Sequence, residues 1–300
     1  MVDLIVVFLA GFLASLVDGA LGMGFGPTSS SILLGTGLSP AGISTTVNLA
    51  KVATGITAAV AHWRFENIDH RLVRRLAVPG CVGALVGVTV LASVDGDRLK
   101  PVLAVLLLVM AARILLRFSK PLRPPAEEEL VDGRALRYDA RGTAAVAATG
   151  GVTNGLVGAW GPVVTPFLLH RGLAPRFAIG SVNTAEVAVA VVASGSLLAS
   201  VGGGGIDLGV VLAMLSGGVL AAPLAAWVIR FLPARALGVA VAGLLFVTNI
   251  RELTSGPDLR GAVRWLAYGA AALACTYAAL RPRLGRDPGG RRVALGDRVP

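Results

Sequence analysis

Long apolar runs, separated by short polar or glycine-rich breaks, make up most of this chain. Most runs approach the ~20 residues that an α-helix needs to cross a lipid bilayer. Because helices satisfy their own backbone hydrogen bonds in lipid, the pattern predicts an all-α, polytopic transmembrane helical bundle. The long runs cover residues 3–20, 42–62, 76–93, 99–117, 143–159, 177–201, 206–229, 235–250 and 261–280, with two short apolar pieces at 27–35 and 162–170.

The pattern of runs and breaks occurs twice. Each copy has a glycine-rich break, a short apolar piece, a Gly-Leu-x-Pro turn and an asparagine inside the next run. We therefore predict two transmembrane repeats, each with a broken helix and a short half-helix. The predicted units are repeat 1 at 1–118, a cytoplasmic linker at 119–141, repeat 2 at 142–250, an extra transmembrane helix within 251–280 and a basic cytoplasmic tail at 281–300.

The distribution of basic residues predicts how the two copies are oriented. If every run crosses the membrane, short pieces included, the connecting segments alternate between its two sides. Twenty-one of the 27 lysines and arginines then fall on one side and five on the other, and such an excess marks the cytoplasmic face. Five crossings per copy is an odd number, so we expect the second repeat to be inverted, with the N-terminus outside and the C-terminus inside.

Composition narrows the classes of function. Apolar residues form 55% of the chain and charged residues 15%, too few charges to cover a soluble fold of this size. The net charge of +10 does not indicate a nucleic-acid partner, because the basic residues lie between apolar runs without interleaved aromatics. Cys81 and Cys275 stand alone in apolar runs, so we expect no disulfide, metal or cofactor. No nucleophile–base grouping occurs in the runs, which argues against an enzyme.

The two glycine-rich breaks form the first candidate binding site. Irregular backbone at membrane depth is tolerated where it lines a cavity, and glycine lets the backbone approach an ion closely. Prolines suit the first turn of each short helix, whose N-terminus would face the break and favour an anion. Close helix packing is the competing interpretation, and for the threonine so is a hydrogen bond to its own helix. The candidates are Gly22, Gly24, Gly26, Pro27, Thr28, Trp160, Gly161 and Pro162.

Polar residues at matched positions form the second candidate site. Asn48 and Asn183 are 135 residues apart, as are Lys51 and Glu186 one helical turn later, and all four lie inside apolar runs. Charges at this depth are costly and mark function by default. In one interpretation the asparagines and Lys51 bind an anion while Glu186 carries a coupling proton. In the other, the asparagines bond between helices and Lys51 and Glu186 form a structural ion pair. For Asp18 two interpretations are open, a cap of the first break or a place in the cytoplasmic vestibule, and we favour the cap.

The two breaks also carry a resemblance to a known family. Gly19–Pro27 and Gly155–Pro162 each lead into a short apolar helix and a Gly-Leu-x-Pro turn, and Ile-Asp pairs end at Asp69 and Asp207. Over about residues 5–250 the chain resembles the sulfite exporter (TauE/SafE) family of bacterial membrane proteins, also called the toluene sulfonate uptake permease family. Neither break has that family's usual Gly-Ile-Gly-Gly-Gly run. The resemblance implies ion-coupled transport of anions such as sulfite, sulfoacetate or organosulfonates.

Pattern and resemblance together predict a secondary active transporter in the bacterial plasma membrane. We expect it to export a small sulfur-containing anion by alternating access around a midplane site. Its expected partners are the lipid bilayer, the anion and a coupling proton, and a homodimer is an open alternative. Two other functions stay open as well. One is a passive anion channel, which would have a continuous pore; the other is a membrane protein that binds partners without transport.

Overall fold

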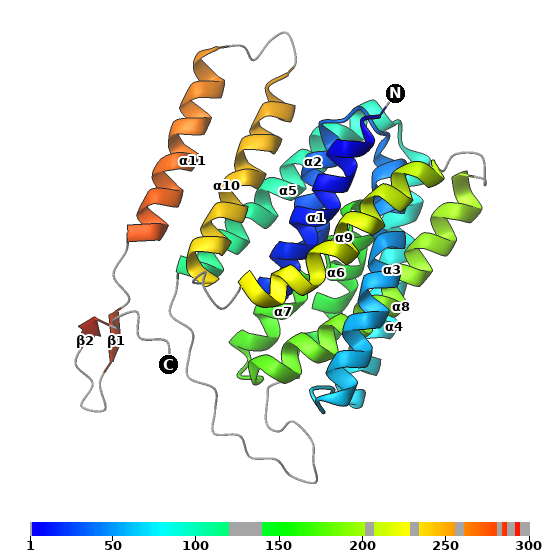
Figure 1. The fold of residues 1–300 in the computed structure, drawn as a ribbon, viewed down its shortest axis with the longest axis vertical. Coiled ribbons are helices and arrows are strands. Elements are labelled where there is room, and N and C mark those ends of the chain that lie inside the picture. The colour runs from blue at the N-terminus through cyan, green and yellow to red at the C-terminus, as the bar shows by residue number, and fades with distance from the viewer. Residues whose placement is uncertain are drawn as a thin grey trace.

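The computed structural model describes residues 2–119, 140–201, 207–228, 234–255, 261–280, 284–286 and 292–294. The predicted linker and most of the predicted tail therefore lie outside the described residues. The described chain is a helical bundle, and a two-stranded hairpin of β1 (Leu284–Arg286) and β2 (Arg292–Ala294) lies in the tail (Figure 1). The predicted all-α transmembrane class is confirmed, and the small hairpin is a feature that the hydrophobic pattern does not predict.

Each repeat contributes five helices in the same order of long and short elements. Of the helices in the described ranges, α4, α5, α8, α10 and α11 are long and apolar enough to cross a membrane. The first repeat contains α1 (Leu4–Leu21), α2 (Phe25–Leu34), α3 (Pro40–Arg64), α4 (His70–Ser93) and α5 (Gly96–Ser119). The second contains α6 (Thr143–Val157), α7 (Gly161–His170), α8 (Pro175–Val201), α9 (Leu208–Val228) and α10 (Ala234–Leu253), and α11 (Ala262–Leu280) follows it.

Matched residues in the sequence begin and end equivalent helices. Asp69 accepts hydrogen bonds from two backbone N–H groups in the first turn of α4, at 2.9 and 3.1 Å. Asp207 does the same at the start of α9, at 2.9 and 3.3 Å. Gly22 and Gly158 follow α1 and α6 with φ of 65° and 66°, a left-handed conformation that favours glycine. The repeat is therefore visible in the caps as well as in the sequence.

The two short helices are each too short to cross a lipid bilayer. Both α2 and α7 have ten residues, so each rises about 15 Å, half of the ~30 Å hydrocarbon core. The expectation that every apolar run crosses is therefore wrong for these two. Each short helix instead runs back beside the helix before it, so α1–α2 and α6–α7 are hairpins that reach into the bundle. Because the chain reverses direction at each break, it returns to the side of the membrane from which it entered. The side of the membrane assigned to each later loop is therefore unchanged.

Contacts at helix ends give the directions of the equivalent helices. The Ser181 hydroxyl, near the start of α8, accepts a hydrogen bond at 2.9 Å from the N–H of Asp69, just beyond α3. Phe118, near the end of α5, packs against Gly238, near the start of α10. Thus α3 runs antiparallel to α8, and α5 antiparallel to α10. Equivalent helices therefore point in opposite directions, which agrees with the predicted inversion.

Two helix pairs form the most extensive contacts in the bundle. α1 of the first repeat packs along α9 of the second, and the equivalent α6 of the second repeat packs along α4 of the first (Figure 1). Glycines allow these close approaches: a Cβ added to Gly11 or Gly217 in the first pair, or to Gly83 or Gly151 in the second, would overlap a carbonyl group of the neighbouring helix. We call these pairs the α1–α9 unit and the α4–α6 unit.

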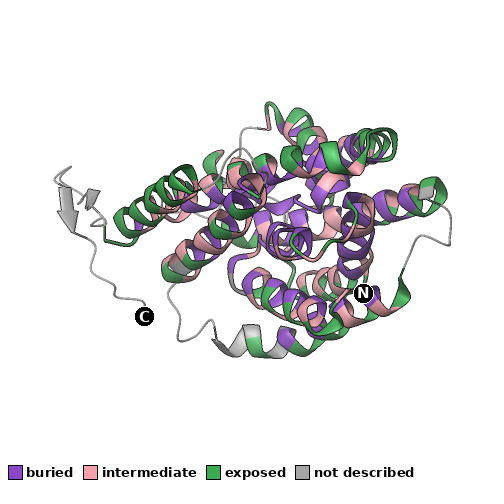
Figure 2. Cartoon of the chain, turned by 90° about the horizontal axis from the view of Figure 1, so that it is seen from above, coloured by how far each residue is buried: buried purple, intermediate pink, exposed green. Residues whose placement is uncertain are grey.

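Buried residues concentrate where the two repeats meet, and exposed residues cover the outside (Figure 2). α11 lies at the edge, where it packs against α10. Of its nineteen residues, Ala278 is the one that is buried. The exposed Trp265, Leu266 and Leu273 of α11 suit contact with lipid.

Candidate functional site

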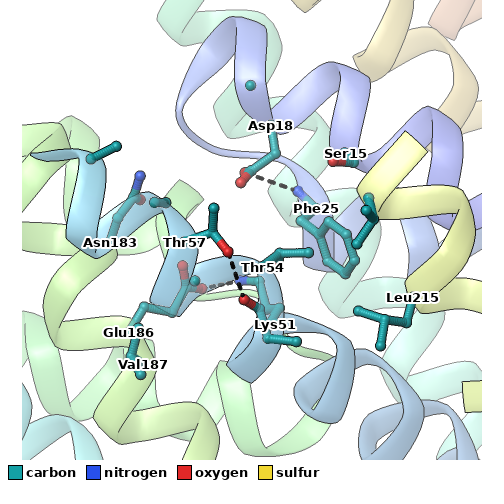
Figure 3. Close-up of a pocket in the computed structure, with 16 residues that line it drawn as sticks. Ser15, Asp18, Phe25, Lys51, Thr54, Thr57, Asn183, Glu186, Val187 and Leu215 are labelled. Carbon is teal, nitrogen blue, oxygen red and sulfur yellow. Dashed lines mark hydrogen bonds and ion pairs between the residues drawn. The ribbon is translucent and has the colours of Figure 1, made fainter. Parts of the chain in front are cut away.

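The central feature of the bundle is an ion pair between Lys51 on α3 and Glu186 on α8 (Figure 3). Both residues lie near the middle of the molecule, and their side chains are only 7% and 12% exposed. The Lys51 ammonium also donates a hydrogen bond at 3.2 Å to the carbonyl of Gly158, in the break between α6 and α7. The fold therefore brings together the two charges that the sequence matches at a spacing of 135 residues.

A cavity of about 580 Å³ adjoins this ion pair, between α1, α3, α8 and α9 (Figure 3). It extends along α3 from Lys51 to Ala61, toward the side where α3 ends and α8 begins. The exposed Thr57 lies on this path. Pockets of this size hold small-molecule ligands. Its polar and charged lining residues are Ser15, Asp18, Lys51, Thr54, Thr57, Asn183 and Glu186.

Asp18 contributes to this cavity as well as to the break. Its carboxylate accepts a hydrogen bond from the N–H of Phe25 at 3.2 Å, so the predicted capping role is confirmed. The same side chain lines the cavity, so the cap and a place beside an open space are not exclusive alternatives for Asp18. Asp18 aligns with Asn154 in the repeat. Among the described lining residues the charges are thus two carboxylates and one ammonium.

The equivalent region of the other half holds a closed hydrogen-bonded pair. The Asn154 side-chain amide donates to Asn48 Oδ1 at 2.7 Å, and the Asn48 side-chain amide donates to the backbone carbonyl of Asn154 at 3.2 Å. Both side chains are fully buried. In the repeat Asn48 matches Asn183 and Asn154 matches Asp18, so the same two positions are bonded on one side and face a cavity on the other. We call the region around Asn48 and Asn154 the closed half, and that around Asp18 and Asn183 the open half.

The two glycine breaks pack against each other between these halves. Gly26 lies so close to Gly158 that an added Cβ would overlap the Gly158 carbonyl. At the equivalent contact, a Cβ added to Gly161 would lie 3.7 Å from the Gly22 carbonyl oxygen and 3.0 Å from the Cβ of Met23. The backbone therefore approaches more closely in the closed half than in the open half.

An aromatic residue marks the same difference. Trp160 is fully buried in the closed half, where its indole N–H donates to the Val182 carbonyl at 3.2 Å and its ring packs on Gly80 and Gly150. Its equivalent in the repeat, Phe25, lines the cavity of the open half. Both rings are buried, but the ring of the open half borders the cavity.

The predicted site residues divide between these regions. Asn183, Lys51 and Glu186 line the cavity, and Asn48 lies buried in the closed half. The Thr28 hydroxyl is buried without a hydrogen-bond partner among the described residues. The remaining candidates lie in or next to the two breaks, outside the cavity lining: Gly22, Gly24, Gly26, Pro27, Trp160, Gly161 and Pro162.

Comparison with known proteins decides the family. Residues 7–251, which contain both repeats, match the family described as Sulfite exporter TauE/SafE. The chain belongs to this family. A curated relative of this TauE/SafE protein, named "Probable membrane transporter protein YtnM", from Bacillus subtilis (strain 168), is 38% identical over 273 residues, which cover 90% of this chain and 89% of the relative. No solved structure matches the chain. The TauE/SafE protein is thus a multi-pass membrane transporter, and α11 lies beyond the family match.

Proposed function

We propose that this TauE/SafE protein is a secondary active transporter that exports small sulfur-containing anions such as sulfite or organosulfonates. The observation that carries the proposal is the Lys51–Glu186 ion pair at the inner end of the cavity of the open half. A charge pair at this depth marks a substrate or ion pathway by default. The anion binds near Lys51 and is released on the other side after the two halves exchange their open and closed states.

The charges of the cavity support coupling to protons. Among the described lining residues the cation is Lys51, and it is ion-paired with Glu186. An anion entering beside Asp18 and an ionised Glu186 meets two like charges at short range in a medium of low dielectric constant. A proton on Glu186 removes one of these charges and releases the Lys51 ammonium for the anion. Binding of the anion is thereby linked to protonation of Glu186.

The closed half supports a carrier over a passive channel. A channel needs a continuous path, whereas this cavity ends at the ion pair, beyond which Asn48, Asn154 and Trp160 are fully buried. The cavity itself supports transport over a purely structural role, because an interaction protein has no need of polar groups around a space of this size at membrane depth.

The excess of basic residues supports an orientation with the N-terminus outside and the C-terminus in the cytoplasm. The cavity then opens to the cytoplasm, from which an exporter takes its substrate. Accessibility of a tag at each terminus tests this orientation in intact cells, and an external C-terminal tag contradicts it.

The decisive test is flux through purified protein in proteoliposomes. We expect sulfite, sulfoacetate or sulfate to accumulate when a proton gradient is applied, and to accumulate far less without it. Glu186→Gln should transport downhill with little response to the gradient, and Lys51→Gln should lose transport. Lys100→Gln is the matched control, because Lys100 pairs with Asp97 at an exposed position remote from the cavity. Absence of flux for every sulfur oxyanion, with folded protein, would refute the proposal.

A further inference from the structure

We propose that Asn48 and Asn154 form one of two alternative gates, and that Asp18 and Asn183 form the other when the cavity closes. This inference rests on the proposed transport function, because a carrier must alternate between two states. The gate of the closed half is present in the structure as two hydrogen bonds, at 2.7 and 3.2 Å. The residues of the second gate line the cavity, and no hydrogen bond joins them in the described structure.

The repeat supplies the geometry of the second gate. Inverted repeats can exchange conformations, so that each half adopts the arrangement the other has left. Because Asn183 matches Asn48 and Asp18 matches Asn154, the exchange places the Asp18 carboxylate where Asn154 now donates to Asn48 Oδ1. A carboxylate only accepts, so the Asn183 amide turns its Nδ2 group toward Asp18. An amide N–H donates to a carboxylate oxygen, so the second gate is chemically complete. The second gate also covers the Asp18 carboxylate, which faces the cavity in the open state.

Helix packing shows which parts would move. α4 packs against α8 more extensively than its equivalent, α9, packs against α3, and the cavity occupies the space between α9 and α3. In both the α1–α9 unit and the α4–α6 unit, the backbones of the two helices lie close together at glycines. Each unit therefore behaves as one body, and the exchange closes the α1–α9 unit on α3 while the α4–α6 unit leaves α8.

The closed gate has an unmet hydrogen-bonding requirement. Asn154 Oδ1 is buried and has no partner among the described residues. In the open half the equivalent oxygen of Asp18 accepts the N–H of Phe25. Forming the closed gate thus leaves an acceptor unsatisfied, which is costly in a buried site. A gate with such a deficit opens more readily than a fully satisfied core contact, as a carrier requires.

Two equivalent alanines report the two states. Ala58 lines the cavity, whereas Ala193, its match in the repeat, is fully buried. We place a single cysteine at either position in a background with Cys81→Ala and Cys275→Ala, and measure labelling by a charged maleimide in lipid nanodiscs. In the parent, Ala58→Cys should label rapidly and Ala193→Cys slowly.

Removing one gate should shift the two reporters in opposite directions. Asn154→Ala weakens the present gate, so labelling at Ala193→Cys should rise about threefold to tenfold while labelling at Ala58→Cys falls, as expected for the loss of interhelical hydrogen bonds in a membrane protein. Asn183→Ala removes the alternative gate and should have the reverse effect. Asn249→Ala is the matched control: Asn249 is buried and donates to Ser31 at 2.8 Å, and in the described structure it has no hydrogen bond to a residue of either gate and no place in the cavity lining. Its loss should leave the ratio of the two rates unchanged.

Three results overturn the inference: unchanged labelling in Asn154→Ala, a rise at both reporters together, or the same shift in Asn249→Ala. A rise at both reporters indicates general loosening rather than exchange of gates. The test does not depend on the substrate. If the two reporters shift in opposite directions but no sulfur oxyanion is transported, the gates are supported and the proposed function is refuted. If sulfur oxyanions are transported but the reporters do not shift in opposite directions, the proposed function is supported and the gates are refuted.

Discussion

The closed and open halves are built from equivalent helices, caps and breaks, yet the cavity beside Lys51 and Glu186 lies in the open half, whereas Asn48 and Asn154 of the closed half are fully buried. Three substitutions between the repeats accompany the difference. The Asn154 amide donates to Asn48 where the Asp18 carboxylate can only accept, and Trp160 stands where Phe25 borders the cavity. The third is the opposite charge at positions 51 and 186. A common backbone plan thus supports two states, and a few side chains select the one observed.

The largest expected effect concerns the ion pair where the halves meet. Lys51→Gln alone should destabilise the protein by about 3–5 kcal/mol, because it leaves the Glu186 carboxylate buried without its partner. The double variant Lys51→Met with Glu186→Leu should regain most of that stability, since apolar residues often replace a buried ion pair at little cost. Unfolding in a titration with SDS measures both. If the double variant is stable but inactive in flux, the pair serves transport; if it stays as unstable as Lys51→Gln, the pair holds the repeats together.

The contact between the breaks should respond more strongly in the closed half. Gly26→Ala places a methyl group against the Gly158 carbonyl, which is backbone and cannot rotate away. Overpacking of this kind should cost about 3 kcal/mol, the upper end of its usual range. Gly161→Ala meets Met23 and should cost about 1 kcal/mol. The thermal midpoint in detergent ranks the two variants, and equal losses would show that the halves are packed alike.

A smaller effect is expected from making the closed half resemble the open half. Trp160→Phe removes ring volume and the hydrogen bond to Val182, and should destabilise by about 1–2 kcal/mol. Trp265→Phe on α11 is the matched control, because that ring is 72% exposed and should tolerate the change. A neutral Trp160→Phe variant would mean that the filled space does not stabilise the closed half.

The smallest effect tests where the halves are alike. Asp69→Ala and Asp207→Ala each remove the N-cap of an equivalent helix, and each should cost about 1 kcal/mol. The two losses in free energy of unfolding should agree, because both carboxylates accept two N–H groups with similar geometry. A large difference between the two losses would show that the repeats also differ in stability outside the cavity region.

Much of this fold follows from the sequence because its signals are local. The run predicted at 42–62 is α3 (Pro40–Arg64), and the breaks predicted at the glycines end α1 and α6. The pairing of Lys51 with Glu186 also follows, since inversion brings equivalent helices together. The expectation that the short pieces cross fails because hydropathy reports polarity, whereas crossing requires length.

The difference between the halves was not predictable in the same way. The alignment of the repeats treats Asn48 and Asn183 as equals, but one is bonded and buried while the other faces a cavity. That difference depends on how whole units pack, which no local pattern records. For Asp18 the sequence leaves a cap and a vestibule as alternatives, and in the structure the same carboxylate both caps the break and lines the cavity.

The position of Lys51 and Glu186 bears on how such a protein can arise. Equivalent residues of antiparallel, equivalent helices face each other at this point. Two identical chains assembled in opposite orientations would set lysine against lysine there, or glutamate against glutamate, and like charges would repel. Opposite charges at this point require two copies that mutate separately. Joining both copies in a single gene, then letting each drift from the other, is what makes a charge-balanced centre available to this architecture.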